Sequence, residues 1–289
     1  MFSVQCPMAS GPIGVFDSGY GGLTILRQIR RLMPQYDYLY LGDNARAPYG
    51  TRSFDIVYEF TLQAVRYLFE QGCHLVILAC NTASAKALRS IQQKDLPELD
   101  PKRRVLGIIR PTVEVVGDIS KSRHVGIMAT PGTIRSRTYE LEIAKLSPDI
   151  QVTGEACPMW VPLVENDEYD SPGADYFVRK RIESLISRDP LIDSVILGCT
   201  HYPLLLDKIR QFMPENVNII EQGSYVAQSL KNYLFRHPDM LEHITAGGTA
   251  CFLTTEQAET FQSKAAAFMG EQLKADRVYL EQNLVKYHI

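Results

Sequence analysis

The chain has 289 residues, 45% of them hydrophobic and 22% charged, and its formal net charge is −3. This length predicts two domains or lobes, and the scattered Lys and Arg argue against nucleic acid as the main partner. The N-terminus lacks a basic start, and no apolar run approaches membrane-spanning length, so we expect neither a secretory signal nor a membrane anchor.

Short apolar runs alternate with amphipathic stretches, which is typical of an α/β fold with buried parallel strands. We expect strands at residues 12–16, 37–42, 75–79, 105–109, 124–129, 194–198 and 217–221. Helices are expected at residues 22–33, around 57–68 with a stop at Gly72, and at 84–93, 133–145, 173–187 and 203–213. The motifs that carry polar side chains fall where strands give way to helices.

The cysteines are irregularly spaced, and without CxxC or CxxH pairs they predict no zinc site. With no signal peptide, they are expected to be the reduced thiols of a cytoplasmic protein. The six are Cys6, Cys73, Cys80, Cys157, Cys199 and Cys251. For any one of them, the alternative to a functional role is that of a small buried apolar side chain.

An internal similarity singles out two of these cysteines. LVILACNTAS (75–84) and SVILGCTHYP (194–203) each read as an apolar strand, a small residue, a cysteine and the start of a helix. Their separation is about one small domain, as expected from a domain duplication, although short V-I-L strings also recur by chance. Cys80 and Cys199 would then lie beyond the carboxyl ends of strands, where open α/β sheets bind ligands.

The helix that follows each cysteine is expected to lower the pKa of its thiol below the usual value of about 8.5. Two such thiols that face one another suit an acid and base pair. A racemase needs this pairing, because one group removes the Cα proton while the other returns a proton to the opposite face.

Two polar loops are further site candidates. Asp17 and Ser18 lie in GVFDSGYGG (14–22), where glycines let the backbone approach a ligand, although a tight turn with a helix cap is the alternative. The loop matches neither the phosphate-loop nor the dinucleotide-binding pattern. In GDNARAPYG (42–50), Tyr49 and Gly50 end a loop whose backbone N–H groups suit a carboxylate, or which is simply polar.

His201 and Glu165 complete the residue-level candidates. His201 closely follows Cys199, so it is placed to tune or protonate that thiol, although a lone histidine is more often structural. Glu165 follows the mostly apolar run CPMWVPLV, which favours a strand-end carboxylate that points into the cleft. A solvated loop glutamate is the alternative.

With these residues located, the chain resembles the glutamate racemase family over nearly all of its length. The motifs that carry the resemblance are DSGYGGLTIL (17–26), GDNARAPYG (42–50), ACNTAS (79–84), ATPGTIRS (129–136) and GCTHYPLL (198–205). The resemblance implies two pseudo-symmetric parallel-sheet α/β domains with the active site in the cleft between them. It further implies no pyridoxal phosphate, no metal, a homodimer, and a D-glutamate product that feeds peptidoglycan synthesis. It divides the chain into residues 1–106 and 107–216, with 217–289 completing the first domain.

The resemblance also assigns roles residue by residue. Cys80, with Asp17 beside it, matches the base that acts on D-glutamate, and Cys199, with His201 and Glu165 beside it, matches the base that acts on L-glutamate. The positions that match substrate-binding residues are Asp17, Ser18, Tyr49, Gly50, Asn81, Thr82, Thr133, Thr200 and His201. Hydroxyls, amides and backbone N–H groups suit a small zwitterion with an extra carboxylate.

Arg110 departs from the acidic or neutral residue that many relatives carry, which implies a local difference in packing or interface. Three other readings remain open. A racemase for aspartate or hydantoins shares the fold, although the His of GCTHYP favours glutamate. A binding protein could hold an acidic amino acid without chemistry, and the cysteines could form a redox pair or supply a peptidase nucleophile.

Overall fold

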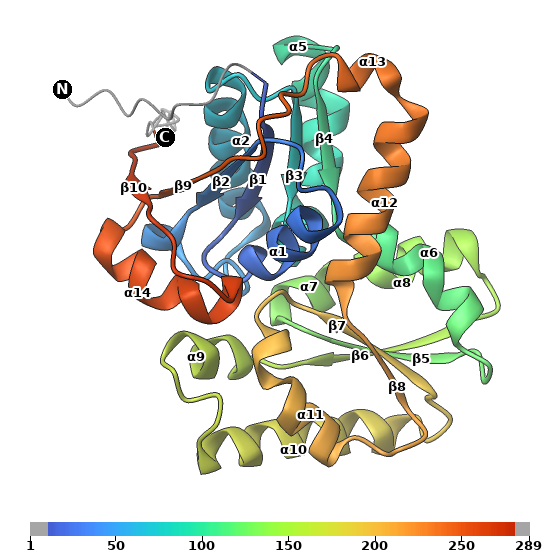
Figure 1. Ribbon diagram of the computed structural model, residues 1–289. Helices are drawn as coiled ribbons and strands as arrows, with labels where there is room; N and C mark the ends of the chain where they lie inside the picture. The colour runs from blue at the N-terminus through green and yellow to red at the C-terminus, as the bar shows by residue number, and fades with distance from the viewer. Residues whose placement is uncertain (1–10, 281–289) are drawn as a thin grey trace, which may run out of the picture.

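The computed structural model describes residues 11–280, which form two lobes, each built on a parallel β-sheet (Figure 1). All strand pairings in this range are parallel. The six-stranded sheet has the order β10-β9-β2-β1-β3-β4, and the four-stranded sheet has the order β6-β5-β7-β8. The expected α/β class with two parallel sheets is confirmed.

The first sheet takes its strands from both ends of the described chain. They are β1 (Ile13–Asp17), β2 (Tyr38–Gly42), β3 (Leu75–Leu78), β4 (Arg104–Gly107), β9 (Ala250–Thr254) and β10 (Asp276–Arg277). The second sheet contains β5 (His124–Ala129), β6 (Gln151–Ala156), β7 (Ser194–Gly198) and β8 (Asn218–Ile220). The expected boundary at residue 217 falls just before β8, which pairs with β7 in the second sheet.

Helices cover the sheets and connect successive strands. The longer ones are α1 (Gly22–Leu32), α2 (Phe54–Glu70), α6 (Ile109–Ile119), α8 (Thr138–Leu146), α10 (Pro172–Arg188), α12 (Gln222–Arg236) and α14 (Ala258–Met269). The shorter ones are η1 (Asn44–Arg46), α3 (Asn81–Lys86), α4 (Leu88–Ser90), η2 (Ile91–Asp95), α5 (Leu96–Leu99), α7 (Pro131–Ser136), α9 (Trp160–Glu165), η3 (Tyr202–Leu205), α11 (Leu206–Phe212) and α13 (Pro238–Leu241). After β8, helix α12 packs on α1 and returns the chain to the first lobe (Figure 1).

All seven expected strands are present, because each contains an apolar run of the kind that parallel sheets bury, although the edge strands β4 and β8 are only partly buried. The central strands β1, β2, β3 and β7 are buried along their whole length. The expected helix over 133–145 was wrong in one respect, since Arg137 adopts a left-handed conformation (φ 54°) and separates α7 from α8. The expected strand over 105–109 ends at Gly107, and Ile109 already begins α6.

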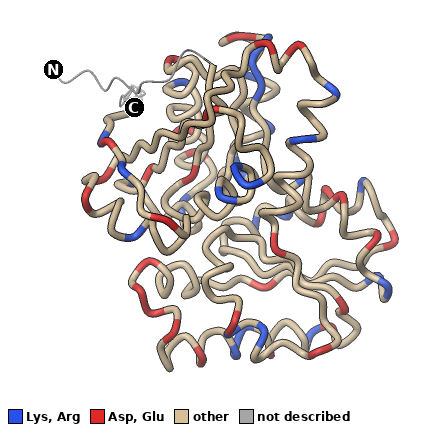
Figure 2. Tube along the Cα trace, viewed as in Figure 1, with Lys and Arg blue, Asp and Glu red and all other residues tan. Residues whose placement is uncertain are grey.

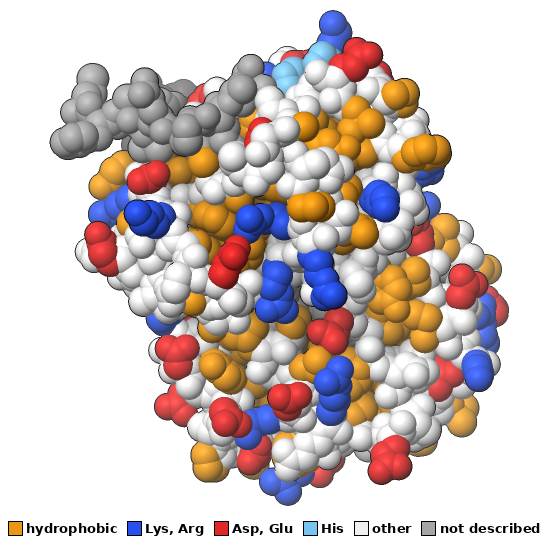
Figure 3. All heavy atoms as spheres, viewed as in Figure 1, with side chains coloured by type: hydrophobic (Ala, Val, Ile, Leu, Met, Phe, Trp, Pro, Cys, Tyr) orange, Lys and Arg blue, Asp and Glu red, His pale blue; other side chains and the backbone are white. Residues whose placement is uncertain are grey.

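Basic and acidic side chains are interspersed over the surface, with no extended stripe of one sign on the face shown (Figures 2 and 3). In residues 11–280, no helix is both long and apolar enough to cross a membrane.

Candidate active site

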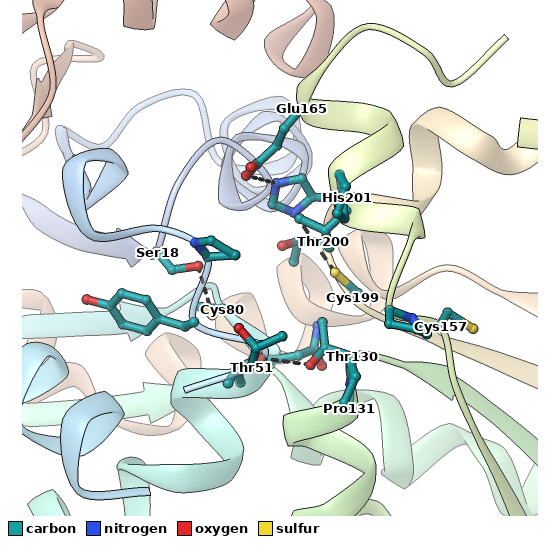
Figure 4. Close-up of a pocket in the computed structure, with 18 residues that line it drawn as sticks. Ser18, Thr51, Cys80, Thr130, Pro131, Cys157, Glu165, Cys199, Thr200 and His201 are labelled. Carbon is teal, nitrogen blue, oxygen red and sulfur yellow. Dashed lines mark hydrogen bonds and ion pairs between the residues drawn. The ribbon is translucent and has the colours of Figure 1, made fainter. Parts of the chain in front are cut away.

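A pocket lies where the carboxyl ends of the two sheets meet (Figure 4). The first sheet contributes the segments after β1, β2 and β3, and the second contributes those after β5, β6 and β7. Of the predicted site residues, those that line the pocket are Ser18, Tyr49, Gly50, Cys80, Asn81, Thr82, Glu165, Cys199, Thr200 and His201. Asp17 and Thr133 lie behind this lining. The two lobes therefore bring the two predicted thiols into one cavity.

Cys80 follows β3 after one residue, Ala79, and caps α3, where its Sγ accepts a hydrogen bond from the Ala83 N–H at 3.4 Å. Ser18 Oγ lies 3.4 Å from the same sulfur. Burial, reinforced by the negative charge of Asp17, raises the pKa of the Cys80 thiol to about 12, although both hydrogen bonds act in the opposite direction. The expected lowering of this pKa by the helix was wrong, because desolvation outweighs the helix N-terminus.

Asp17 is the last residue of β1 and is buried beside Cys80. Its Oδ2 accepts a hydrogen bond of 2.9 Å from the Gly19 N–H, whereas its buried Oδ1 has no hydrogen-bond partner among the described residues. Burial raises the pKa of Asp17, although the His201 charge opposes this effect. A Cβ at Gly22 would lie 2.5 Å from the Cβ of Asp17, so the close approach of α1 requires glycine there.

Cys199 follows β7 in the second lobe and has a different set of partners. Its Sγ lies 3.9 Å from Nδ1 of His201, and Nε2 of His201 lies 3.1 Å from Oε1 of Glu165 (Figure 4). Burial alone would lower the pKa of His201, but hydrogen bonds and charge interactions with Cys199 and Glu165 raise it to about 10. His201 therefore carries a positive charge at neutral pH, directly beside the Cys199 sulfur.

Glu165 reaches this group from an element that differs from the expected one. It is the last residue of helix α9, not a strand-end residue, so that part of the prediction was wrong. The run before it is apolar because Trp160, Val161, Leu163 and Val164 are buried by the helix. Lys264 on α14 donates a hydrogen bond to the Glu165 carbonyl oxygen, which joins α9 to the first lobe.

Three threonine hydroxyls meet at another wall of the pocket. Thr82 Oγ1 lies 3.0 Å from Thr130 Oγ1 and 3.4 Å from Thr133 Oγ1, and the latter two are 3.1 Å apart. Thr130 caps α7 by accepting from the Thr133 N–H. Hydroxyls can donate or accept, so this cluster suits a carboxylate or an ammonium group of a ligand.

Gly50 brings the loop after β2 against the second lobe. A Cβ at Gly50 would lie 2.8 Å from the Cβ of Thr130, and the Gly50 carbonyl accepts a hydrogen bond of 2.8 Å from the Gly132 N–H. The neighbouring Tyr49 hydroxyl donates to Asp43, which fixes the orientation of the ring. The loop therefore closes one side of the pocket with backbone rather than with a large side chain.

Several residues that line the pocket were not predicted from the sequence: Pro48, Thr51, Thr130, Pro131, Cys157, Pro158, Val161 and Pro162. Thr130 and Cys157 share a usable feature, since each directly follows a strand. Cys157 was missed because β6, QVTGEA, is polar and only partly buried, so it shows no apolar run.

The oxidation states of the cysteines differ from the expectation in one place. Cys73, Cys80, Cys157 and Cys199 are buried free thiols, as expected. Cys251 is disulfide-bonded, so the expectation of reduced thiols throughout is wrong for this residue. Cys6 lies outside the described residues.

Arg110 lies away from the pocket, on α6. It pairs with Glu114 at 3.1 Å and with Glu142 on α8 at 3.5 Å, and its side chain is about half exposed (55%). It thus links two surface helices and does not contact the predicted site. Within residues 11–280, no group of three or more His, Cys, Asp or Glu side chains suits a metal ion.

Comparison with known proteins places this geometry in a family. A family model described as Asp/Glu/Hydantoin racemase matches residues 22–230. The glutamate racemase of Ruegeria sp. (strain TM1040) is 40% identical over 271 residues, which cover 90% of this chain and 97% of the relative. The chain belongs to the Asp/Glu/hydantoin racemase family.

Solved racemase structures resemble the whole of the described fold. A glutamate racemase isoform from Bacillus anthracis has a TM-score of 0.85 at 34% identity, with 93% of this chain and 98% of that chain covered. The glutamate racemase from Francisella tularensis, solved in complex with D-glutamate, has a TM-score of 0.82 at 31% identity, with 94% and 98% covered. The two-lobed arrangement is therefore that of the racemase family.

Proposed function

We propose that this chain is a glutamate racemase, an isomerase that interconverts L- and D-glutamate without pyridoxal phosphate or metal. The observation that carries the proposal is that Cys80 and Cys199 follow corresponding strands of the two sheets, β3 and β7, and line one pocket. Each thiol has its own acid–base partners, Asp17 for Cys80 and His201 with Glu165 for Cys199. The similarity to curated glutamate racemases supports glutamate over aspartate or a hydantoin as the substrate.

The charges around the two thiols favour one assignment of base and acid when L-glutamate is the substrate. Cys199, beside the charged His201, is the thiolate that removes the Cα proton. Cys80, whose pKa is raised, keeps its proton and delivers it to the opposite face of the carbanion. After this step Cys80 is the thiolate and Cys199 is the thiol, which is the arrangement that the reaction from D-glutamate requires.

The high pKa of Cys80 also makes it a strong base once it has lost its proton. The α-ammonium group of a bound amino acid adds a positive charge to the pocket, and a nearby opposite charge favours the thiolate form. Asp17, also buried with a raised pKa, is placed to exchange a proton with this half of the site. The pocket thus holds two buried thiols whose different partners favour opposite protonation states before the reaction.

The remaining predicted residues would hold the substrate by hydrogen bonds. Hydroxyl, amide and backbone N–H groups along the pocket are the proposed ligands of the two carboxylates and the ammonium group. They are Ser18, Tyr49, Gly50, Asn81, Thr82, Thr200 and His201, with Asp17 and Thr133 behind them.

The proposal also covers the location of the protein, its oligomeric state, the use of its product and its domain division. We infer that the protein is cytoplasmic, forms a homodimer and supplies D-glutamate for peptidoglycan synthesis. We also keep the proposed division into residues 1–106 and 107–216, with 217–289 completing the first domain after β8, which pairs with the second sheet.

Isotope incorporation tests the two-thiol mechanism. When the reaction starts from L-glutamate in heavy water, early D-glutamate should carry deuterium at Cα, while unreacted L-glutamate stays mostly protiated. The reason is that Cys199 keeps the substrate proton, whereas solvent-equilibrated Cys80 delivers deuterium to the other face. Enantiomers are separated after the first few per cent of conversion and analysed by mass spectrometry, and the reverse reaction is started from D-glutamate.

Cys73→Ala is a matched control, because Cys73 is a buried free thiol that does not line the pocket. It should label product as the unmodified protein does. Mostly protiated product in both directions would reject two separate proton carriers, even in an active racemase. Binding of glutamate with no interconversion would favour a binding protein instead.

A further inference from the structure

Behind the two thiols, three buried side chains close a ring of hydrogen bonds. Asn81 Nδ2 donates to Gln222 Oε1 at 2.6 Å, Gln222 Nε2 donates to Tyr139 Oη at 2.8 Å, and Tyr139 Oη donates to Asn81 Oδ1 at 2.7 Å. Each group donates once and accepts once around the ring, an arrangement in which the hydrogen bonds polarise one another. None of the three residues is more than 4% exposed.

The ring joins helices that belong to different parts of the fold. Asn81 begins α3, which follows the first sheet, Tyr139 lies on α8 beside the second sheet, and Gln222 begins α12. Helix α12 packs on α1 of the first lobe and also contacts α6 (Figure 1). The ring is therefore a buried polar connection between the lobes.

The ring also contacts the neighbours of both thiols. Asn81 directly follows Cys80, and the Tyr139 ring packs against Gly198, the residue before Cys199. A Cβ at Gly198 would lie 3.2 Å from Tyr139 Cε2, so only glycine allows this contact without displacement. A shift of Tyr139 relative to Asn81 would thus change the position of one thiol relative to the other.

Tyr139 and Gln222 do not line the pocket, so they have no direct contact with a ligand there. Asn81 does line it, and the ring uses one of its two amide hydrogens and leaves the other for a ligand. The ring consequently reaches the site through Asn81 and through the strand end at Gly198.

We propose that Tyr139 and Gln222 are positioning residues that hold Cys80 and Cys199 at the separation needed for proton transfer to opposite faces of one carbon. The inference rests on the proposed function. Proton transfer and carbanion capture depend steeply on alignment, and a displacement of about 1 Å can lower a rate by about 100-fold. A hydrogen-bonded ring between lobes restricts such displacements.

Tyr139→Phe is the direct test, because it removes the hydroxyl and keeps the aromatic ring against Gly198. We expect kcat to fall at least about tenfold in both directions, while KM stays within about threefold, since the pocket lining is intact and only alignment is lost. Tyr38→Phe is the matched control: Tyr38 is also buried, and its hydroxyl donates to the Met33 carbonyl at 2.7 Å, away from the pocket. This control should keep kcat even where it lowers the unfolding temperature.

Gln222→Leu opens the same ring at another member, so the double variant should lose no more kcat than the more affected single variant. The positioning role is overturned if Tyr139→Phe keeps the kcat of the Tyr38→Phe control. It is also overturned if the kcat losses of the two single variants multiply in the double variant. Thermal unfolding shows whether each variant folds. If one of the two single variants does not fold, the kcat of the other, compared with the Tyr38→Phe control, tests the positioning role. Failure of the unmodified protein to racemise glutamate would instead contradict the proposed function.

Discussion

Substitution of Glu165 by Gln should shift the alkaline limit of activity toward lower pH. Glu165 Oε1 lies 3.1 Å from His201 Nε2, and this contact contributes to the pKa of about 10 at His201. A hydrogen bond to a charged group contributes about 1.5 to 3 kcal/mol, and one pKa unit corresponds to about 1.4 kcal/mol. The neutral amide can still accept this hydrogen bond but removes the negative charge, so the pKa of His201 should fall by at most about 1 to 2 units.

The shift of the alkaline limit toward lower pH follows from the protonation state that His201 needs. In the proposed mechanism His201 assists Cys199 only while the imidazole is charged, so activity should decline as pH rises through the pKa of His201. Cys80, with its pKa near 12, remains protonated across this interval. Near neutral pH, His201 stays mostly charged in Glu165→Gln, so the largest loss should appear in the alkaline range.

The assay is the initial rate of racemisation from each enantiomer, measured between about pH 6 and 10.5 by chiral separation of the products. The alkaline limb of kcat/KM reports the free protein and should move with the substitution. An active Glu165→Gln variant whose alkaline limb coincides with that of the unmodified protein would refute the view that Glu165 holds His201 charged.

Five further substitutions probe the two halves of the site. Cys80→Ala and Cys199→Ala should each abolish racemisation in both directions, and more than about a tenth of the original turnover would mean that the thiol is not an essential proton carrier. Asp17→Asn and His201→Asn should bias kcat and KM for the two enantiomers in opposite senses, and identical kinetic changes would remove the assignment of one partner to each thiol. Gly21→Ala should lower turnover while circular dichroism shows that the fold is retained. The reason is that its Cβ would lie 2.4 Å from Thr200 Oγ1 and 2.5 Å from His201 Nδ1. Unchanged turnover would show that Thr200 and His201 can move aside without an effect on the reaction.

The sequence predicts the strands and the strand-end thiols well, because burial of an apolar run and the turn after it are local properties. β1, β3 and β7 each contain an apolar run that leads to Asp17, Cys80 or Cys199. Elements with mixed composition are harder to predict. β6 has no apolar run, and α9 has an apolar one that imitates a strand because most of its short helix is buried.

Long-range effects set the properties that the sequence does not predict. The helix after Cys80 is a local feature that favours a thiolate, yet the pKa of this thiol is raised by burial between lobes and by Asp17, which lies far away in the chain. The ring through Asn81, Tyr139 and Gln222 likewise joins residues whose sequence spacing gives no indication of contact. Such features depend on how the two sheets meet.

The composition of the pocket wall has a consequence for how substrate arrives. None of the described residues that line the pocket is Lys or Arg, and the charged His201 is already paired with Glu165 and Cys199. A protein with a formal net charge of −3 therefore offers an anionic amino acid no long-range attraction toward its site. Encounter should accordingly depend on diffusion and concentration, with little response to ionic strength, and discrimination among acids should begin only after the ligand has entered.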